Sequence, residues 1–294
     1  MQIESLQVFC DLTETESFTR TAKLHSVTQS AVSQQISTLE RLFNSRLIER
    51  SKRHFRLTRE GQVLYEMGKR IVGAYEALHS QMQEIKNVIS GTVRIATVES
   101  LGLHTLPSHL KRYMQSFPTV HLHVAYRRSN KVYEDVVGNV VDVGLVACPA
   151  RDARLECVPL GQEPLVLVCP PDHPLAKSRT LRLSALHGQR FVAFKPDLPT
   201  RKAIDAALRE NGVVTETVME LDNVETMKRA VEVGIGLAIL PLITVTAEVA
   251  AGTLAAVRFG DATLERPWAA VYKKSRVPTT AMRELLNLLK SGVD

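Results

Sequence analysis

The sequence lacks long hydrophobic runs and is poor in the residues that mark disordered or fibrous chains. No segment approaches the roughly 20 consecutive apolar residues that a membrane-spanning helix needs. The 15 glycines and 13 prolines in 294 residues are too few for a low-complexity chain. The opening residues, MQIESLQVFC, show no basic leader followed by an apolar segment, as a secretory signal would. We therefore expect a globular, cytoplasmic protein without a membrane partner.

Patterns that bind metals or cofactors are missing as well. The sequence has only four cysteines, which are Cys10, Cys148, Cys157 and Cys169. They show no Cys-x-x-Cys spacing and no nearby histidine pair. His121 and His123 share one face of an expected strand, but no third ligand is evident. We expect no metal and no cofactor, and we interpret the cysteines as buried reduced thiols, with a redox switch as the alternative.

Catalytic signatures are equally absent from the sequence. It contains no Gly-x-Ser-x-Gly nucleophile motif, no His-Glu-x-x-His and no Walker-type phosphate loop. Gly234-x-Gly236 gives half of a dinucleotide-binding fingerprint without the third glycine, and a tight helix-to-strand turn explains it. We therefore predict that the protein is not an enzyme.

The positive charge of the chain is concentrated in one segment. The formal net charge is +6, with an isoelectric point near 9.2. Residues 41–59 hold seven Lys and Arg against Glu49 alone, an excess as large as that of the whole chain. Such a segment is often only a solvated surface, but it is also the electrostatic footprint of a nucleic-acid-binding protein. Its position beside the motif described next favours nucleic acid.

Three short helices are predicted before this basic segment. Residues 4–14 have apolar side chains at helical spacing, and Ser17 is a good N-cap for a second helix, SFTRTAKLH. In that helix we expect Phe18, Ala22 and Leu24 to face inward. A tight turn, His-Ser-Val, then leads into a third helix, so the pattern is a helix-turn-helix.

The third helix predicts one buried face and one polar face. Thr28 caps the helix, and Val32, Ile36 and Leu39 form its buried side. The residues we expect to meet DNA carry hydroxyl or amide groups and are Thr28, Gln29, Ser30, Ser33, Gln34 and Ser37. Glutamine pairs with adenine, and serine bonds to bases or phosphates. The alternative is a generic three-helix core, but a solvent face usually includes Glu or Asp, and this one has neither before Glu40.

The run AKLHSVTQSAVSQQISTLE, from Ala22 to Glu40, resembles the helix-turn-helix signature of LysR-type transcriptional regulators. The following LFNSRLIERSKRHFRLTREG resembles the family's two-stranded wing, with Leu57, Thr58 and Gly61 at its end. This resemblance implies a DNA-binding domain over residues 1–58. It also implies that the basic residues of the wing contact phosphate or the minor groove, namely Arg50, Lys52, Arg53 and Arg56.

A long linker helix is predicted over residues 59–90. This stretch has no proline, and Leu64, Ile71, Leu78 and Ile85 recur every seven residues. Such a repeat is typical of a coiled-coil seam, so we expect a homodimer that presents two recognition helices to an interrupted inverted repeat. A single helix packed on its own chain is the alternative. The family resemblance further implies homotetramers built from such dimers.

After Gly91, short apolar runs alternate with helical stretches, which predicts an α/β domain with mainly parallel sheets. The arrangement resembles the LysR-type effector domain, which is similar to periplasmic binding proteins. That resemblance implies two lobes with a ligand between them. The first lobe takes residues 91–161 and 266–294, and the second takes residues 162–265.

Five residues are predicted to bind the effector. Thr97 and Ser100 lie in the loop after the first strand of the domain, and Thr200, Arg201 and Asn223 lie at helix starts in the second lobe. Helix N-termini and arginine favour a small organic anion, although Thr and Asn also cap helices without binding anything. Glu99 would repel an anion and would suit a cationic or zwitterionic ligand.

Together these features predict an α/β protein with an N-terminal all-α winged helix-turn-helix, a long linker helix and a two-lobed effector domain. We expect it to regulate transcription with double-stranded DNA, a small effector and RNA polymerase as partners. A solute receptor of a transporter is the main alternative, and the helix-turn-helix argues against it.

Overall fold

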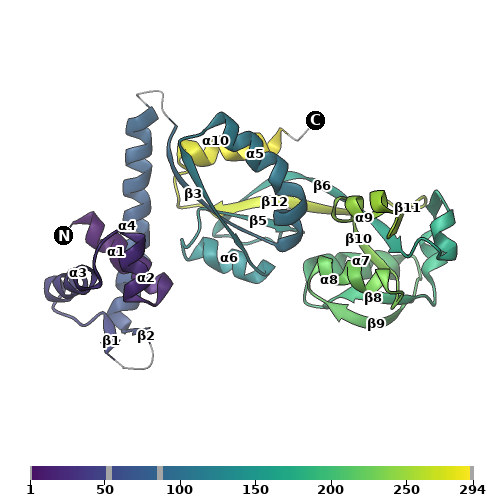
Figure 1. Cartoon of the computed structure of the whole chain (residues 1–294), viewed down its shortest axis with the longest axis horizontal. Coiled ribbons are helices and arrows are strands. Elements are labelled where there is room, and N and C mark those ends of the chain that lie inside the picture. Colours follow the sequence, from purple (N-terminus) through teal and green to yellow (C-terminus); the bar gives the residue numbers. More distant parts are fainter. Residues whose placement is uncertain (1, 51–54, 85–88, 292–294) are drawn as a thin grey trace. The chain divides into compact units, whose positions relative to one another are not determined.

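The computed structural model describes residues 2–50, 55–84 and 89–291. The chain divides into two compact units (Figure 1). One comprises Met1–Gly91 with Gly138–Val140 and Ser275–Thr280. The other comprises Thr92–Val137, Val141–Lys274 and Ala281–Asp294. Across the described residues, no helix is both long enough and apolar enough to cross a membrane.

The first unit is a three-helix domain with a two-stranded wing and a long helix. Its elements are α1 (Ile3–Thr15), α2 (Phe18–Leu24), α3 (Gln29–Leu42), β1 (Ile48–Arg50), β2 (Phe55–Leu57) and α4 (Arg59–Glu84). The Ser17 hydroxyl accepts the backbone N–H of Arg20, and the Thr28 hydroxyl accepts that of Ala31 at 3.2 Å. Both predicted helix starts are therefore confirmed, and β1 pairs antiparallel with β2 as a wing requires.

The core of this domain draws on every short element. Its fully buried members come from α1, α2, α3 and the start of the wing, and are Val8, Phe9, Leu12, Ala22, Val32, Ile36, Leu39, Leu47 and Ile48. The expectation for Leu24 is wrong, because its side chain is 61% exposed. Thr21 and Ala22 fill the inward positions instead, and Leu24 lies two residues beyond Ala22, on the opposite side of the helix.

The Leu-Thr-x-x-Gly segment joins the wing to α4. The Thr58 hydroxyl donates to the carbonyl of Arg46 at 2.6 Å and accepts the N–H of Gly61 at 3.0 Å. A Cβ on residue 61 would overlap the carbonyl oxygen of Leu47. Residue 61 must therefore be glycine for the first turn of α4 to approach Leu47, which directly precedes β1 of the wing.

The second unit is built around a mixed sheet with the strand order β4-β3-β5-β12-β6-β11-β7. The strands are β3 (Gly91–Thr97), β4 (Val120–Tyr126), β5 (Val143–Ala147), β6 (Leu155–Cys169), β7 (Thr180–Leu181), β11 (Ala255–Phe259) and β12 (Glu265–Lys273). The helices of its first lobe are the π-helical turn η1 (Leu101–Thr105), α5 (Leu106–Ser116), α6 (Ser129–Val137) and α10 (Thr280–Lys290). Strand β12 runs antiparallel to both β5 and β6.

Strand β6 continues from one lobe into the other. It pairs with β12 from Leu155 to Pro164, and from Leu165 onward it pairs with β10 (Ala238–Pro241) and β11. The strands that connect the two lobes are thus long, continuous and hydrogen-bonded to each other. The predicted lobe boundaries at residues 161 and 266 fall within these two strands and stay a prediction.

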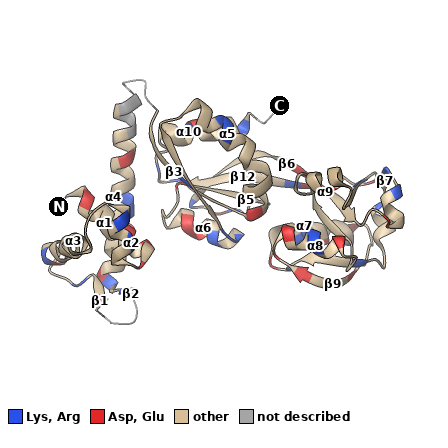
Figure 2. Cartoon of the chain, viewed as in Figure 1, with Lys and Arg blue, Asp and Glu red and all other residues tan. Residues whose placement is uncertain are grey.

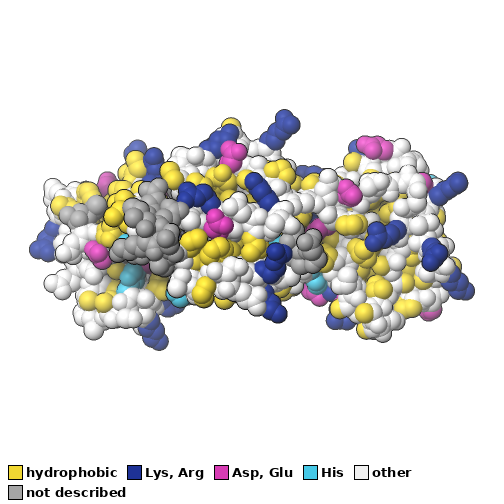
Figure 3. Space-filling model, turned by 90° about the horizontal axis from the view of Figure 1, so that it is seen from above, with side chains coloured by type: hydrophobic (Ala, Val, Ile, Leu, Met, Phe, Trp, Pro, Cys, Tyr) yellow, Lys and Arg dark blue, Asp and Glu magenta, His cyan; other side chains and the backbone are white. Residues whose placement is uncertain are grey.

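The second lobe adds a parallel pair, β8 (Arg190–Phe194) with β9 (Glu216–Leu221). Its α-helices are α7 (Pro199–Glu210), α8 (Val224–Glu232) and α9 (Thr246–Ala251), and its 3-10 turns are η2 (Pro174–Lys177), η3 (Leu183–Leu186) and η4 (Leu242–Val245). Its core is continuous from β6 and β10 to β8 and the inner faces of α7 and α8. On the face drawn in Figure 3, both signs of charge are interspersed with hydrophobic side chains.

The predicted α/β fold with an N-terminal helix-turn-helix is confirmed. The expectation of mainly parallel sheets is wrong, since β10, β11 and β12 all run antiparallel to β6. The alternation of strands and helices reveals the α/β class but not the direction of a strand that returns to the sheet after a long excursion. The apolar runs of the sequence also did not predict β7, β9 and β11.

Candidate functional site

The outer face of α3 is polar and accessible. Thr28, Gln29, Ser30, Ser33 and Gln34 are exposed, and Ser37 is half-buried. The charged residues of this helix, Glu40 and Arg41, lie near its end, and the rest of α3 is uncharged (Figure 2). Glu40 is turned toward the wing, because its carboxylate accepts the backbone N–H of Leu47 at 3.0 Å. The face therefore offers neutral hydrogen-bonding groups without acidic charge.

Exposed basic residues lie near the end of α3 and in the wing segment that follows it. Arg56 on β2 is exposed, and so are Arg41 and Arg46, which sequence reasoning counted in the basic segment but did not assign to the site. Arg50 ends β1, opposite Phe55. Lys52 and Arg53 lie outside the described residues.

Helix α4 has hydrophobic side chains on two sides. Leu64 is half-buried and packs against the core of the three-helix domain. Ile71 and Leu78 are 45% and 56% exposed, and Met67 and Met82 are similarly exposed. Ile85 lies outside the described residues. The helix thus carries an exposed apolar stripe, while Leu64 already has partners in its own chain.

A cleft of about 310 Å³ lies between the two lobes of the second unit. Loops that follow β3, β4, β8 and β9 form it, together with residues of β5 and β12. Its charged and hydrogen-bonding residues are Glu99, Ser100, Tyr126, Arg127, Arg128, Ser129, Thr200, Asp222, Asn223 and Arg266. Ser100, Thr200 and Asn223 were predicted from the sequence.

The other two predicted effector residues do not line this cleft. Thr97 is fully buried in β3, and its hydroxyl donates to the carbonyl of Val98 at 3.3 Å. The guanidinium of Arg201 donates to Asp205 at 2.8 Å and to Glu220 at 3.0 Å. Arg201 begins an i, i+4 pair on the surface of α7, and this local partner holds the side chain away from the cleft.

Arg266, which lines the cleft, belongs to a buried ion pair. Arg266 of β12 is 2% exposed and donates through Nε to Glu163 of β6 at 2.8 Å. Its Nη1 donates to the Ser100 hydroxyl at 3.1 Å, and the other carboxylate oxygen of Glu163 accepts from Thr105. The full set of hydrogen bonds satisfies two charges that would be costly to bury singly. Sequence reasoning missed this pair, although a charged residue within an apolar strand was a visible signal.

Three polar contacts cross from the first lobe to the start of α8. Arg128 forms an ion pair with Asp222, Asn223 Nδ2 donates to Glu99 Oε2 at 2.6 Å, and His104 Nε2 lies 2.7 Å from Glu225 Oε1. We call these three pairs the α8 clasp. Hydrogen bonds from Arg128 and Lys195 hold the pKa of Asp222 below its ordinary value.

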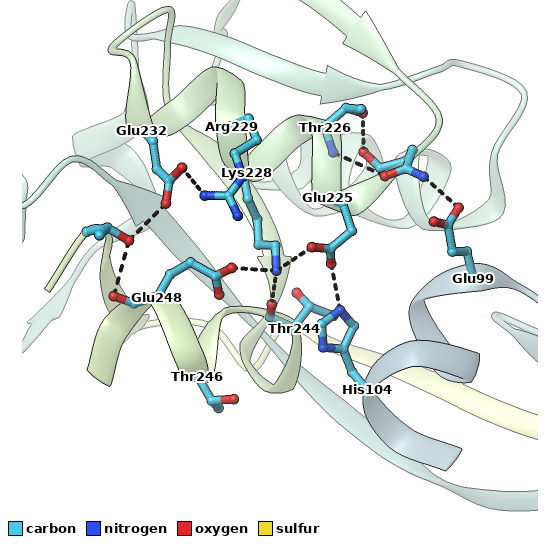
Figure 4. Close-up of polar contacts among 12 residues, drawn as sticks. Glu99, His104, Glu225, Thr226, Lys228, Arg229, Glu232, Thr244, Thr246 and Glu248 are labelled. Atoms are coloured by element: carbon cyan, nitrogen blue, oxygen red, sulfur yellow. Dashed lines mark hydrogen bonds and ion pairs between the residues drawn. The ribbon is translucent and has the colours of Figure 1, made fainter. Parts of the chain in front are cut away.

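A buried lysine supports the clasp from within the second lobe. Lys228 is 2% exposed and lies 2.9 Å from Glu225, 2.8 Å from Glu248 and 3.0 Å from the Thr244 carbonyl oxygen (Figure 4). Burial by itself would raise the pKa of Glu225. The hydrogen bonds from Lys228 and His104 have the larger combined effect, so the pKa lies below its ordinary value. Glu225 is therefore held as a carboxylate.

The two helix N-termini at the cleft, those of α7 and α8, differ in whether a side chain caps them. Asn223 caps α8 itself, since its side-chain oxygen accepts the N–H of Thr226 at 3.1 Å. Helix α7 begins after Leu198, which provides no side-chain cap, and Pro199 is in its first turn. The positive end of the α7 dipole thus lies at Thr200, where an external anion can take the place of a cap.

The four cysteines are free, and their burial differs from the expectation. Cys10 and Cys169 are buried, but Cys148 is only partly buried and Cys157 is exposed. Burial raises the pKa of Cys10 to about 12 and that of Cys169 to about 11. Among the described residues, no group of three or more His, Cys, Asp or Glu side chains is arranged to hold a metal ion.

A winged helix-turn-helix followed by a two-lobed domain with a cleft is the architecture of a ligand-responsive transcriptional regulator. Residues 3–62 match the family model described as "Bacterial regulatory helix-turn-helix protein, lysR family", and residues 86–294 match "LysR substrate binding domain". The chain therefore belongs to the LysR family of transcriptional regulators.

Known proteins resemble the chain over its whole length or over its second domain. The HTH-type transcriptional regulator CysL of Bacillus subtilis is 25% identical over 99% of this chain and 98% of its own length. Full-length OxyR from Pseudomonas aeruginosa superimposes with a TM-score of 0.81 at 20% identity, over 99% of this chain and 95% of that one. The regulatory domain of Synechocystis PCC6803 CcmR, solved with 2-PG, has a TM-score of 0.62 at 22% identity, over 69% and 97%. The predicted family and two-lobed fold are confirmed.

Proposed function

We propose that this regulator binds an interrupted inverted-repeat operator as a homodimer or homotetramer, and that a small organic anion in the interlobe cleft changes this binding. The observation that carries the proposal is the cleft, which is lined by Ser100, Arg266 and Thr200, the last at the uncapped start of α7. RNA polymerase at the promoter is the partner on which the regulator acts.

The DNA-binding part of the proposal rests on the exposed face of α3. Gln29, Ser33 and Gln34 are accessible, and glutamine and serine read base edges in the major groove. Arg56 of the wing is exposed, with Arg50, Lys52 and Arg53 in the same basic segment. Phosphate contacts from these residues would orient the domain and make binding depend on salt.

The assembly part rests on the exposed apolar stripe of α4. We propose residues 1–58 as the DNA-binding domain and residues 59–90 as the helix that pairs with a second copy. Ile71 and Leu78, with Ile85 in the same heptad position, form the seam. Leu64 contributes to the stability of the domain through its contacts within the chain.

The effector part rests on the polar lining of the cleft. Ser100 and Thr200 face it from opposite lobes, and Asn223 adds an amide beside them. We divide the lobes as residues 91–161 with 266–294 and residues 162–265, so that the cleft lies at their junction. The CcmR regulatory domain, which has the same fold, was solved with 2-PG. A ligand that binds better to one lobe arrangement shifts the equilibrium toward it, and DNA must alter ligand affinity by the same factor.

The test is a thermal-shift screen of small organic acids on the full-length protein, followed by a gel shift on the upstream region of the neighbouring gene. Ser100→Ala and Thr200→Ala should each lower the affinity for the identified acid by a factor of at least about ten. That is the loss expected when one hydrogen bond to a charged group is removed. Operator binding without ligand should persist. Ser178→Ala, an exposed serine outside the cleft, is the matched control. Equal affinity in all variants would refute this effector site.

A further inference from the structure

The arginines of the cleft already have anionic partners in their own chain. Arg127 Nε lies 3.1 Å from Asp135, Arg128 pairs with Asp222, and Arg266 pairs with Glu163. These three guanidinium groups are the cationic side chains of the cleft lining. An entering anion would therefore compete with a resident carboxylate at each of them.

Glu99 differs from these carboxylates because its partner is neutral. Its Oε2 accepts a hydrogen bond from the Asn223 amide at 2.6 Å, which is the dashed line that ends on the labelled Glu99 in Figure 4. The side chain is exposed and lines the cleft. The start of α8 supplies only a partial positive charge, about half an elementary charge for a helix N-terminus. The cleft thus contains one carboxylate whose full charge is not balanced by a full cation.

A region suited to an anion lies directly beside Glu99. The Ser100 hydroxyl accepts from Arg266, so its own proton is left to donate to a ligand oxygen. Thr200 faces the same cleft at the uncapped start of α7. The lining therefore has one pole that suits an anion and one that suits a cation.

We propose that the effector is a short zwitterion, with its anionic group at Ser100 and Thr200 and its cationic group at Glu99. This proposal rests on the effector site of the proposed function and narrows its ligand class. Glu99 and Ser100 are consecutive residues and line the same cleft, so we expect the ligand's two charges to lie close together along a short molecule. An α- or β-amino acid meets this requirement, and a cleft of about 310 Å³ suits a molecule of that size.

A simple carboxylate is the competing ligand. It would draw Arg128 away from Asp222, which Lys195, 3.2 Å from the same oxygen, would continue to neutralise. That ligand would leave Glu99 facing a second negative charge. Removal of the Glu99 charge should therefore lower the affinity for a zwitterion and leave or raise the affinity for a simple carboxylate.

The experiment uses the full-length protein and calorimetry with matched probes. Each α- or β-amino acid is compared with the acid that lacks its amino group and with the amine that lacks its carboxylate, as in alanine, propionate and ethylamine. We expect at least one amino acid to bind at least tenfold more tightly than both of its analogues. Glu99→Gln should weaken the binding of that amino acid at least tenfold. The same variant should bind the acid as tightly as the parent does, or more tightly. Glu156→Gln, at an exposed position on β6 outside the cleft, should change neither.

Two results would contradict the proposal that the effector is a zwitterion. One is an acid without an amino group that binds as tightly as its amino acid, and the other is unchanged amino-acid affinity in Glu99→Gln. An acid that binds as tightly as its amino acid, and that loses affinity in Ser100→Ala, would leave the proposed function standing while removing this inference. If no probe of any charge binds or alters operator binding, both the zwitterion and the proposed anion site fail.

Discussion

Nε2 of His104 lies 2.7 Å from Oε1 of Glu225, and this contact joins the π-helical turn after β3 to the first turn of α8. Glu225 is also bound by the buried Lys228, whose second carboxylate partner is Glu248. The contact between the lobes therefore ends on a charge network inside one lobe. Lys228 is buried and His104 is partly exposed, so removal of each should lower the free energy of unfolding by a different amount.

Removal of Lys228 should destabilise the protein far more than removal of His104. Lys228→Met leaves Glu225 and Glu248 without their shared cation, and loss of one partner of a buried ion pair typically costs about 3–5 kcal/mol. His104→Ala removes a partly exposed contact, for which we expect about 1 kcal/mol or less. Urea unfolding of both variants measures the difference. Equal losses would show that Lys228 is not the main support of the clasp.

The clasp should also weaken in acid. Burial raises the pKa of Glu225, but the hydrogen bonds from Lys228 and His104 lower it below its ordinary value of 4.5, and the pKa of Glu248 is lowered as well. The stability that these carboxylates contribute is complete above their ordinary pKa and is lost as the pH falls through the lowered, folded value. Melting temperatures measured between about pH 3 and pH 7 should fall in acid less steeply in a Glu225→Gln/Glu248→Gln variant than in the parent. An identical pH profile in both would contradict the prediction.

Gly61 and Gly68 of α4 should respond differently to alanine. A Cβ on residue 61 overlaps the backbone carbonyl of Leu47, whereas on residue 68 it meets side-chain atoms of Leu6 and Cys10 at 3.0 and 3.1 Å. Backbone cannot move aside as side chains do, so we expect Gly61→Ala to cost about 2 kcal/mol or more, and Gly68→Ala clearly less, because alanine's helix propensity offsets part of its crowding. Denaturant unfolding of the two variants provides the comparison, and the reverse order would refute the role of Gly61.

Substitutions on α3 and on the wing should weaken DNA binding in different ways. Gln34→Ala and Ser33→Ala should lower operator affinity. Each lost base contact should also reduce the discrimination against the wrong base by about 1–3 kcal/mol. Arg56→Ala should weaken binding to all sequences and reduce its salt dependence. Gel-shift titrations at several salt concentrations separate the two effects, with Gln62→Ala on α4 as the control. Unchanged affinity in every α3 and wing variant would exclude this face as the DNA-binding surface.

Charge on the exposed stripe of α4 should prevent dimerisation. Ile71→Glu combined with Leu78→Glu would place unpaired carboxylates in the proposed seam, which is strongly unfavourable. Val214→Glu, at a 68% exposed position in the second lobe, is the matched control. Analytical ultracentrifugation should show a smaller species for the double variant alone. An unchanged oligomer would mean that the copies associate elsewhere.

Local sequence determined the DNA-binding domain. Ser17 and Thr28 cap their helices through hydrogen bonds to residues three positions later, and Val32, Ile36 and Leu39 form a buried face at helical spacing. These interactions span a few residues, so their pattern is visible in the sequence. Leu24 was misplaced because a seven-residue helix has too few apolar positions to fix its rotation.

Tertiary structure decided which charged groups of the cleft remain for a ligand. Arg266 and Glu163 are 103 residues apart in the sequence and meet because β12 and β6 pair in a register that places them opposite each other. Arg201 looked suited to an anion, but Asp205, one helical turn later, binds its side chain. Glu99 gained the neutral partner Asn223 only when the lobes came together. Charges act through space and through burial, so strand register and lobe contact, which no local pattern encodes, determine which charges remain for a ligand.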